Sequence, residues 1–236
     1  MIPYSRQSVD KKDIASVVKI LKSDFLTQGP KVEEFEKRIS NLCKSKYVVA
    51  SNSATSSLHI ACLALNLKSK DIVWTVPNTF VASANCAINC GAEVDFVDID
   101  AMTFNISISS LEKKLVTAKK KGKLPKILIP VHFAGQPTNQ KKIWQLSKKY
   151  KFKIIEDASH SIGASYDNEP VGSCKWSDIT IFSFHPVKII TTGEGGAGLT
   201  NNKFLYDKMK SLRTNGIVKD FKYLKFKKNY PGIMNI

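Results

Sequence analysis

The sequence has no long hydrophobic run and no recognisable targeting segment. No stretch of its 236 residues approaches the roughly 20 apolar residues that a membrane-spanning helix requires. The amino terminus, MIPYSRQSVDKK, carries charges without an apolar segment behind them, so it does not resemble a signal peptide. We therefore expect a cytoplasmic protein that contacts no membrane.

Cysteine is scarce and shows no paired CxxC spacing. The five cysteines are Cys43, Cys62, Cys86, Cys90 and Cys174. Cys86 and Cys90 lie four residues apart in a helical stretch, a spacing that a metal site could use, but no histidine or further cysteine pair lies nearby. We interpret all five as reduced thiols with a packing role and expect no bound metal.

Two nucleotide-binding motifs are also absent. Glycines 193, 195 and 196 do not form the GxGxxG fingerprint of dinucleotide-binding proteins, and no P-loop is present. The composition, with 43% hydrophobic and 24% charged residues, is that of an ordinary globular protein. The length suits one substantial domain.

The net charge of +16 raises the alternative of a nucleic-acid-binding protein. The lysines, however, are scattered along the chain, and the runs at 119–121 and 225–228 fall in connecting stretches. No DNA- or RNA-binding motif accompanies them. We therefore expect no nucleic-acid partner, and salt-sensitive retention on DNA would be needed to revive that alternative.

Helical and strand patterns alternate along most of the chain. Continuous apolar strands separated by helices are typical of a mostly parallel sheet that is covered on both faces, so we predict an α/β fold. Ligands of such sheets bind outside the carboxyl ends of the strands. The predicted strands are 46–51, 71–76, 93–98, 126–131, 152–156, 178–184 and 196–200, and the predicted helices are 10–23, 31–43, 54–66, 79–91, 107–121, 138–150 and 203–214.

Small hydroxyl residues follow the first predicted strand, where Ala54 and Thr55 open a helix. Free N–H groups at a helix amino terminus favour a phosphate, although an ordinary N-cap explains the same residues. After the second strand comes Phe80, whose ring could stack on a flat heterocycle or pack in the core. These two strand ends leave a binding role and a structural role both open.

Two ionisable residues follow the later strands. Asp157 ends the strand that begins at 152, and its carboxylate could pair with a protonated pyridinium nitrogen or cap a helix. Lys188 lies among Pro186, Val187 and Ile189. Partial desolvation would lower its pKa and free its amine for covalent chemistry, whereas in isolation it would be an ordinary surface lysine.

The four segments together are more specific than any one of them. In the order phosphate loop, ring-stacking residue, aspartate and lysine, they resemble the aspartate-aminotransferase fold type of pyridoxal-phosphate enzymes, and within it the DegT/DnrJ/EryC1/StrS family of nucleotide-sugar aminotransferases. The resemblance runs from residue 4 to about residue 219. The segments that carry it are LTQGP, NSATSSLH, TFVASAN, VHFAGQ, EDASHSIGA and FSFHPVKIITTGEGG.

The resemblance implies pyridoxal 5'-phosphate as the cofactor and assigns a role to each matching residue. Lys188 would attach to the cofactor and then move the proton during the reaction. Asp157 would pair with the pyridinium nitrogen, His160 would lie near the phenolic oxygen, and Phe80 would stack on the ring. Three further residues would hold the phosphate and border the substrate: Ala54, Thr55 and Ser183.

The resemblance also implies the substrates and the assembly. Tyr4 and the segment Asp24, Phe25, Leu26 and Thr27 would contact a UDP-linked 4-keto-6-deoxy-N-acetyl hexosamine, with glutamate as the amino donor and a homodimer as the working unit. Relatives that dehydrate sugars carry histidine where this chain has Lys188, so lysine favours transamination. His185 beside the lysine could equally serve packing.

The chain departs from the family after the helix at 203–214. We divide it into an amino-terminal, substrate-contacting arm at 1–30, a cofactor-binding large domain at 31–218 and a tail at 219–236, and we expect the family's small domain to be largely missing. We interpret the tail as truncated, with a one-base frameshift as the hypothesis that genomic DNA would test. Because the small domain would be missing, we expect the chain to bind the cofactor weakly. The alternative to an impaired enzyme is an inactive remnant of it.

Overall fold

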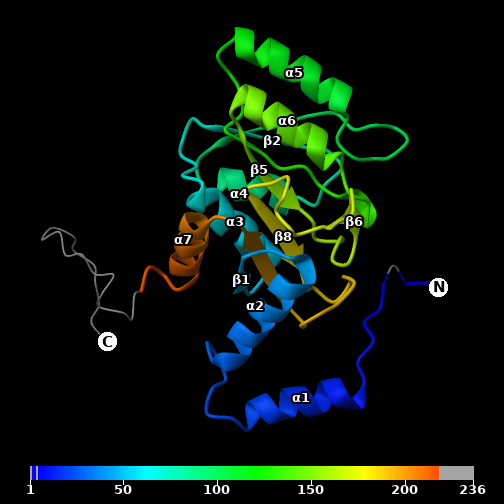
Figure 1. Cartoon of the computed structure of the whole chain (residues 1–236), viewed down its shortest axis with the longest axis vertical. Helices are drawn as coiled ribbons and strands as arrows, with labels where there is room; N and C mark the ends of the chain where they lie inside the picture. The colour runs from blue at the N-terminus through cyan, green and yellow to red at the C-terminus, as the bar shows by residue number, and fades with distance from the viewer. Residues whose placement is uncertain (1, 4, 218–236) are drawn as a thin grey trace, which may run out of the picture.

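A computed structural model, which describes residues 2, 3 and 5–217, shows an α/β fold around one large sheet (Figure 1). The seven-stranded sheet has the order β1-β9-β8-β5-β4-β2-β3. A separate hairpin pairs β6 with β7. The strands are β1 (Tyr47–Ser51), β2 (Ile72–Thr75), β3 (Glu93–Phe96), β4 (Ile127–Leu128), β5 (Lys153–Asp157), β6 (Ser165–Tyr166), β7 (Glu169–Pro170), β8 (Ile179–Ser183) and β9 (Gly196–Thr200).

Most of the sheet is parallel, as the sequence predicts. The pairs β2–β3, β2–β4, β4–β5 and β5–β8 are parallel, whereas β9 is antiparallel to both of its neighbours, β8 and β1. The connection between β8 and β9, residues 184–195, contains no helix, and β9 returns antiparallel to β8, whereas parallel neighbours are usually joined by a helical crossover. The carboxyl ends of β1, β2, β4, β5 and β8 therefore lie along one edge of the sheet.

Alternating side chains send the strands' apolar residues into cores on both faces of the sheet. On β2, Val73 belongs to the core that α3, α4 and α7 cover, while Trp74 belongs to the core under α5 and α6. Phe182 of β8 packs against residues of α2 in a third cluster. The helices are α1 (Lys11–Leu21), α2 (Pro30–Cys43), α3 (Ala54–Ala64), α4 (Ala82–Ile88), α5 (Ile108–Lys120), α6 (Gln140–Tyr150) and α7 (Lys203–Arg213).

Short polar side chains begin several of these helices. Each accepts a hydrogen bond from a backbone N–H of the first turn, which would otherwise lack a partner. Asp10 also forms a capping box with Asp13. The other side-chain N-caps are Ser53, Ser107, Asn139 and Asn202.

Helix α1 stands apart from the sheet, beyond α2 (Figure 1). None of its residues is buried, although its sequence is amphipathic. Four of its large apolar side chains are exposed, namely Ile14, Val17, Val18 and Leu21, and Ile20 is partly buried.

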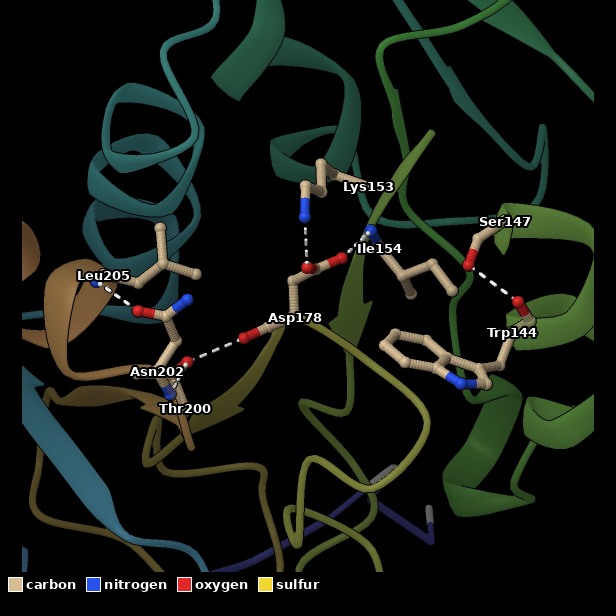
Figure 2. A network of polar contacts seen from close by, with 8 residues as sticks. All are labelled: Trp144, Ser147, Lys153, Ile154, Asp178, Thr200, Asn202 and Leu205. Carbon is tan, nitrogen blue, oxygen red and sulfur yellow. Dashed lines mark hydrogen bonds and ion pairs between the residues drawn. The ribbon is translucent and has the colours of Figure 1, made fainter. Parts of the chain in front are cut away.

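Asp178 ties three strands together at the edge of the sheet where β5 and β8 begin and β9 ends (Figure 2). Its carboxylate accepts hydrogen bonds from the Ile154 N–H and the Lys153 ammonium, both at 2.9 Å. Its carbonyl accepts a bond of 2.8 Å from the Thr200 hydroxyl. The same hydroxyl accepts a bond of 3.2 Å from the N–H of Asn202, which caps α7. One residue before β8 thus fixes the start of β5, the end of β9 and the start of α7.

Two local predictions need correction. The strand predicted at 126–131 is only Ile127–Leu128, because Pro130 has no N–H to continue the ladder. The helix predicted from 79 begins at Ala82, because residues 77–80 form a turn whose Asn78 amide donates to the Phe104 carbonyl at 2.9 Å.

The hairpin of β6 and β7 is an additional element, which we did not predict. Its turn is Asp167–Asn168, with both residues at positive φ, 53° and 60°. This backbone is typical of a type I′ turn, in which aspartate and asparagine are favoured. The Asp-Asn dipeptide was therefore a usable signal.

None of the described helices is long and apolar enough to cross a membrane. Tyr4 and the predicted tail at 219–236 lie outside the described residues. The division of the chain at residues 30 and 218 stays a prediction.

Candidate active site

Lys188 and His160 form a close polar pair at the carboxyl edge of the sheet. The Lys188 Nζ lies 2.6 Å from the His160 Nε2, between the loop that follows β8 and the turn that follows β5. Two positive charges would repel at this distance, so one of the groups is neutral in this contact.

The environment lowers the pKa of both groups. Burial is the main cause for Lys188, which is half-buried, and the nearby negative charge of Asp157 opposes it. Burial also lowers the pKa of His160, and the charge of Lys188 adds to the effect. A lysine whose pKa is lowered has more of the neutral amine that nucleophilic chemistry requires.

Asp157 is the last residue of β5, and its buried carboxylate is held from two sides. The hydroxyl of Ser83, on α4, donates to Oδ2 at 2.6 Å. Ser159 donates to Oδ1 from its hydroxyl at 2.6 Å and from its N–H at 3.2 Å. Turns rather than a helix follow β5, so the alternative of a helix-capping aspartate is wrong.

The sequence reasoning missed these hydroxyl partners. Ser83 is fully buried and also lies 2.9 Å from the Thr79 hydroxyl, so a short chain of hydroxyls leads from the β2–α4 loop to the carboxylate. Ser83 lies in a segment quoted for the family resemblance, yet nothing in its local pattern distinguishes a hydroxyl that faces Asp157 from one that caps a turn. Only the placement of α4 against β5 shows the difference.

His132 is a second group that the sequence reasoning did not single out. It is buried beside Asp157, and burial lowers its pKa to about 4 although the aspartate opposes the shift. Its Nδ1 accepts the N–H of Thr138 at 3.2 Å, and its Nε2 lies 3.1 Å from the Gln140 amide. The His132 imidazole near the Asp157 carboxylate is therefore uncharged.

The amino terminus of α3 supplies an anion-binding geometry. The Ser53 hydroxyl caps the helix by accepting the Ser56 N–H at 3.1 Å, and the Ser53 carbonyl accepts the Ser57 N–H at 3.0 Å. The N–H groups of Ala54 and Thr55, in the same first turn, have no place in the intrahelical ladder and can serve an anion. The capping role and the phosphate role are therefore compatible.

Gly196 allows β9 to approach this turn. A Cβ at this position would overlap the Ser53 carbonyl carbon and the Ala54 nitrogen. Ser183, the last residue of β8, is buried directly opposite Gly196 in the β8–β9 register. The glycine thus brings the start of α3 and the end of β8 together.

Phe80 lies in the β2–α4 loop and is 75% exposed, so the alternative of a core phenylalanine is wrong. A large apolar ring on the surface of a ligand-binding edge is suited to stacking on a flat group. His185 is half-exposed, with its Nε2 4.0 Å from a Glu194 carboxylate oxygen.

The structure does not bring every predicted site residue together. Asp24, Phe25, Leu26 and Thr27 are exposed on the connection between α1 and α2. Within the described part of the chain, no hydrogen bond, ion pair or ring contact joins them to the Lys188 group. Neither do the described residues include a cluster of three or more side chains suited to a metal ion.

A family model describes the same chain from residue 7 to residue 234. It is the model of the DegT/DnrJ/EryC1/StrS aminotransferase family. This chain belongs to that family. Aminotransferases of this family use pyridoxal phosphate, so the donor set around Lys188 fits the family's cofactor.

Curated relatives include two from Campylobacter jejuni. One, named UDP-4-amino-4,6-dideoxy-N-acetyl-beta-L-altrosamine transaminase, is 47% identical over 219 residues. The alignment covers 93% of this chain and 56% of the relative. A second transaminase of the same name, from another strain, is 46% identical with the same coverage. The chain thus spans little more than half the length of these relatives.

Solved structures of aminotransferases share the fold. Helicobacter pylori PseC, described as an aminotransferase involved in the biosynthesis of pseudoaminic acid, superposes with a TM-score of 0.83 at 34% identity. The match covers 93% of this chain and 57% of PseC. The putative sugar aminotransferase Spr1654 of Streptococcus pneumoniae, in its PMP form, gives a TM-score of 0.84 at 30% identity and covers 93% and 58% of the two chains.

Proposed function

We propose that this chain is the cofactor-binding part of a pyridoxal-phosphate-dependent aminotransferase that acts on a UDP-linked 4-keto-6-deoxy-N-acetyl hexosamine. The observation that carries the proposal is the Lys188–His160–Asp157 group. It combines a half-buried lysine of lowered pKa, a histidine at 2.6 Å and a carboxylate fixed by two serines. Membership of the family supports the reaction class, and the altrosamine transaminases of Campylobacter support the sugar.

Pyridoxal phosphate, when bound, supplies an electron sink for the carbon from which a proton is removed. The residues of this chain would hold and serve it. Lys188 would attach to the cofactor and carry the proton, and Asp157 would keep the ring nitrogen protonated. Ser83 and Ser159 would hold that carboxylate in place, since their bonds leave it few other orientations.

The remaining contacts would bind the cofactor's other groups. The first turn of α3, at Ala54 and Thr55, would bind the phosphate with its backbone N–H groups. Phe80 would stack on the ring, and His160 would contact the ring's phenolic oxygen. Ser183 would border both the phosphate and the sugar.

Several finer elements of the proposal rest on the family rather than on contacts in this chain. These are glutamate as the amino donor, the homodimer, the cytoplasmic location, and sugar contacts from Tyr4 and residues 24–27. The likeness to Helicobacter pylori PseC supports a place in the pseudaminic acid pathway for this chain. Histidine would be expected at position 188 in a sugar dehydratase, so Lys188 supports transamination.

Pyridoxal phosphate titration of the purified chain tests the cofactor site. We expect a visible absorbance band of the lysine-bound cofactor, which borohydride reduction fixes on Lys188 in a peptide map. Lys188→Ala should abolish the band, while Lys148→Ala, on the exposed face of α6, should leave it unchanged. No band, or a label spread over several lysines, would refute the proposed site.

A second measurement separates binding from transamination. Adding glutamate to the pyridoxal-phosphate-loaded chain should shift the spectrum to that of pyridoxamine phosphate, and adding the UDP-linked ketone should reverse it. A chain that binds the cofactor on Lys188 but reacts with no amino donor would be a remnant that keeps the site without the activity. That result would overturn the reaction while retaining the site.

A further inference from the structure

The Thr79 hydroxyl lies at the candidate site, and the proposed function gives it no role. It is 2.9 Å from the hydroxyl of Ser83, which donates to the Oδ2 of Asp157 at 2.6 Å. A hydroxyl has a single proton, and Ser83 uses it on the carboxylate. Thr79 must therefore be the donor in its contact with Ser83. The hydrogen bonds thus run in one direction, from the β2–α4 loop to Asp157.

Capping of α4 does not account for this hydroxyl. Threonine near the start of a helix ordinarily accepts a backbone N–H of the first turn. Val81 is the N-cap of α4, and within the described chain no side-chain cap bond is formed there. Thr79 contacts a buried side chain instead, and the Ser83 N–H donates to the Phe80 carbonyl at 3.1 Å. Two hydrogen bonds therefore fix the turn that carries Phe80.

The two oxygens of the Asp157 carboxylate differ in the donors that they already hold. Oδ1 accepts the Ser159 hydroxyl at 2.6 Å and the Ser159 N–H at 3.2 Å. Oδ2 accepts only the Ser83 hydroxyl among the residues that the structure describes. A carboxylate has about four lone-pair sites, two on each oxygen, so Oδ1 is filled and Oδ2 has one site left. A further donor to this carboxylate would therefore share Oδ2 with Ser83.

Thr79 determines where the Ser83 proton points. Serine within a helix can turn its hydroxyl toward a backbone carbonyl of the preceding turn. The bond from Thr79 occupies a lone pair of the Ser83 oxygen and holds the hydroxyl in the orientation that donates to Oδ2. It also polarises the Ser83 hydroxyl, which strengthens the donated bond. Thr79 therefore influences the Asp157 carboxylate through Ser83.

We propose that Thr79 is a positioning residue for the cofactor, which acts through Ser83 to leave one acceptor site on the Asp157 Oδ2 for the ring nitrogen of pyridoxal phosphate. The inference rests on the proposed function and specifies it. The ring N–H would bind Oδ2, while Ser159 holds Oδ1. Phe80, in the turn that Thr79 and Ser83 fix, would be placed against the ring by the same contacts.

Thr79→Val tests this role, because valine keeps nearly the same shape without the hydroxyl. The affinity for pyridoxal phosphate, measured by absorbance titration, should fall about 2- to 10-fold, as expected for the loss of one neutral hydrogen bond. Thr79→Ser keeps the hydroxyl and should retain the affinity. The matched control is Thr117→Val on α5, where an exposed threonine donates to the Lys113 carbonyl at 3.1 Å, and it should leave the affinity unchanged.

A cofactor analogue separates positioning from a general loss of structure. In 1-deazapyridoxal phosphate a C–H group replaces the ring nitrogen, so the analogue has no N–H to place on Oδ2. Thr79→Val should therefore leave the affinity for this analogue unchanged. An equal loss of affinity for both compounds would overturn the proposal, since it would show that the substitution disturbs the site as a whole.

A double variant shows whether Thr79 acts through Ser83. In the Ser83→Ala background, Thr79→Val should change the affinity by less than about twofold, because the chain is already broken. A further loss as large as in the wild type would overturn the proposal. If the wild type carries the cofactor on Lys188 and Thr79→Val binds it equally well, only the role of Thr79 fails. If the wild type carries no cofactor there, the proposed site fails and this inference with it.

Discussion

Glu156 makes the stability of this domain depend on pH near neutrality. It lies on β5, beside Asp157 but with its side chain on the other face of the strand, and is 3% exposed. Its carboxyl accepts hydrogen bonds from the hydroxyls of Thr180 at 2.7 Å and Ser177 at 3.1 Å. Burial raises its pKa from 4.5 to about 7, although these two bonds oppose the shift.

The sign of the effect follows from the direction of the shift. The folded state binds the proton more tightly than the unfolded chain, so the stabilisation is fully present below pH 4.5. It is lost as the pH rises through 7, where the folded state must hold a buried charge. Each pKa unit corresponds to about 1.4 kcal/mol, so the rise from 4.5 to about 7 amounts to roughly 3 kcal/mol.

The perturbation is Glu156→Gln, which keeps the shape and the oxygen acceptor but cannot ionise. Urea unfolding at a series of pH values from 5 to 8.5 should show the wild type losing roughly 2 to 3 kcal/mol relative to the variant, most of it between pH 5 and 7. The comparison uses the change with pH, so a constant cost of burying the amide cancels.

The matched control is Glu112→Gln on α5, whose carboxylate is partly exposed and pairs with Lys142 at 3.0 Å. It should follow the wild-type pH dependence to within about 1 kcal/mol, as expected of a surface pair. A constant difference between wild type and Glu156→Gln across the range would refute the reasoning. It would mean that the buried carboxyl keeps one protonation state throughout.

Three further predictions concern single contacts. Ser83→Ala removes a hydrogen-bond donor from the buried Asp157 carboxylate, so the affinity for pyridoxal phosphate, measured by absorbance titration, should fall about 10- to 100-fold. Borohydride reduction should still fix the cofactor on Lys188. Unchanged affinity would contradict the role of Ser83 in positioning Asp157. Gly196→Ala places a methyl group against the Ser53–Ala54 backbone and should cost about 1 to 3 kcal/mol in urea unfolding. Gly198→Ala should cost less, because its methyl group meets the side chains of Met209 and Ile181 and no backbone. Asp178→Asn should lower the free energy of unfolding by about 1 to 3 kcal/mol, because Lys153 loses its ionic partner. Asp167→Asn, which breaks the exposed ion pair with Lys141, should lower it by less than about 1 kcal/mol. Equal losses in the two variants would argue against the network of Figure 2.

The period of the apolar residues was sufficient to predict the large elements. Strands such as 152–156 and helices such as 203–214 end within two residues of their predicted limits, because continuous apolar runs and N-caps act locally. The direction of β9 in the sheet could not be predicted from the sequence. A strand of GAGLT is compatible with either direction, and its antiparallel pairing depends on how the loop at 185–195 returns.

Some residues of the candidate site could likewise be predicted from the sequence, and others could not. Asp157 and Ala54–Thr55 follow predicted strands, so the topology alone places them at one edge. The hydroxyl of Ser83 reaches Asp157, and His132 lies within its electrostatic influence, only because α4 and the loop after β4 pack there, which no local pattern encodes. Long-range packing of this kind appears only in three dimensions.

Cofactor attachment and recognition of the nucleotide-sugar depend on different parts of the described chain. Within the described residues, the side chains around Asp157 come from the elements around one sheet. They are Ser83 from α4, His132 from the loop after β4, Ser159 and His160 from the turn after β5, and Lys188 from the loop after β8. Residues 24–27, by contrast, have no contact with that group in the described chain. Covalent attachment of the cofactor should therefore not depend on residues 24–27, while discrimination between nucleotide-sugars should require additional surfaces. A chain that binds pyridoxal phosphate on Lys188 yet treats different UDP-sugars alike would be the expected behaviour of this arrangement.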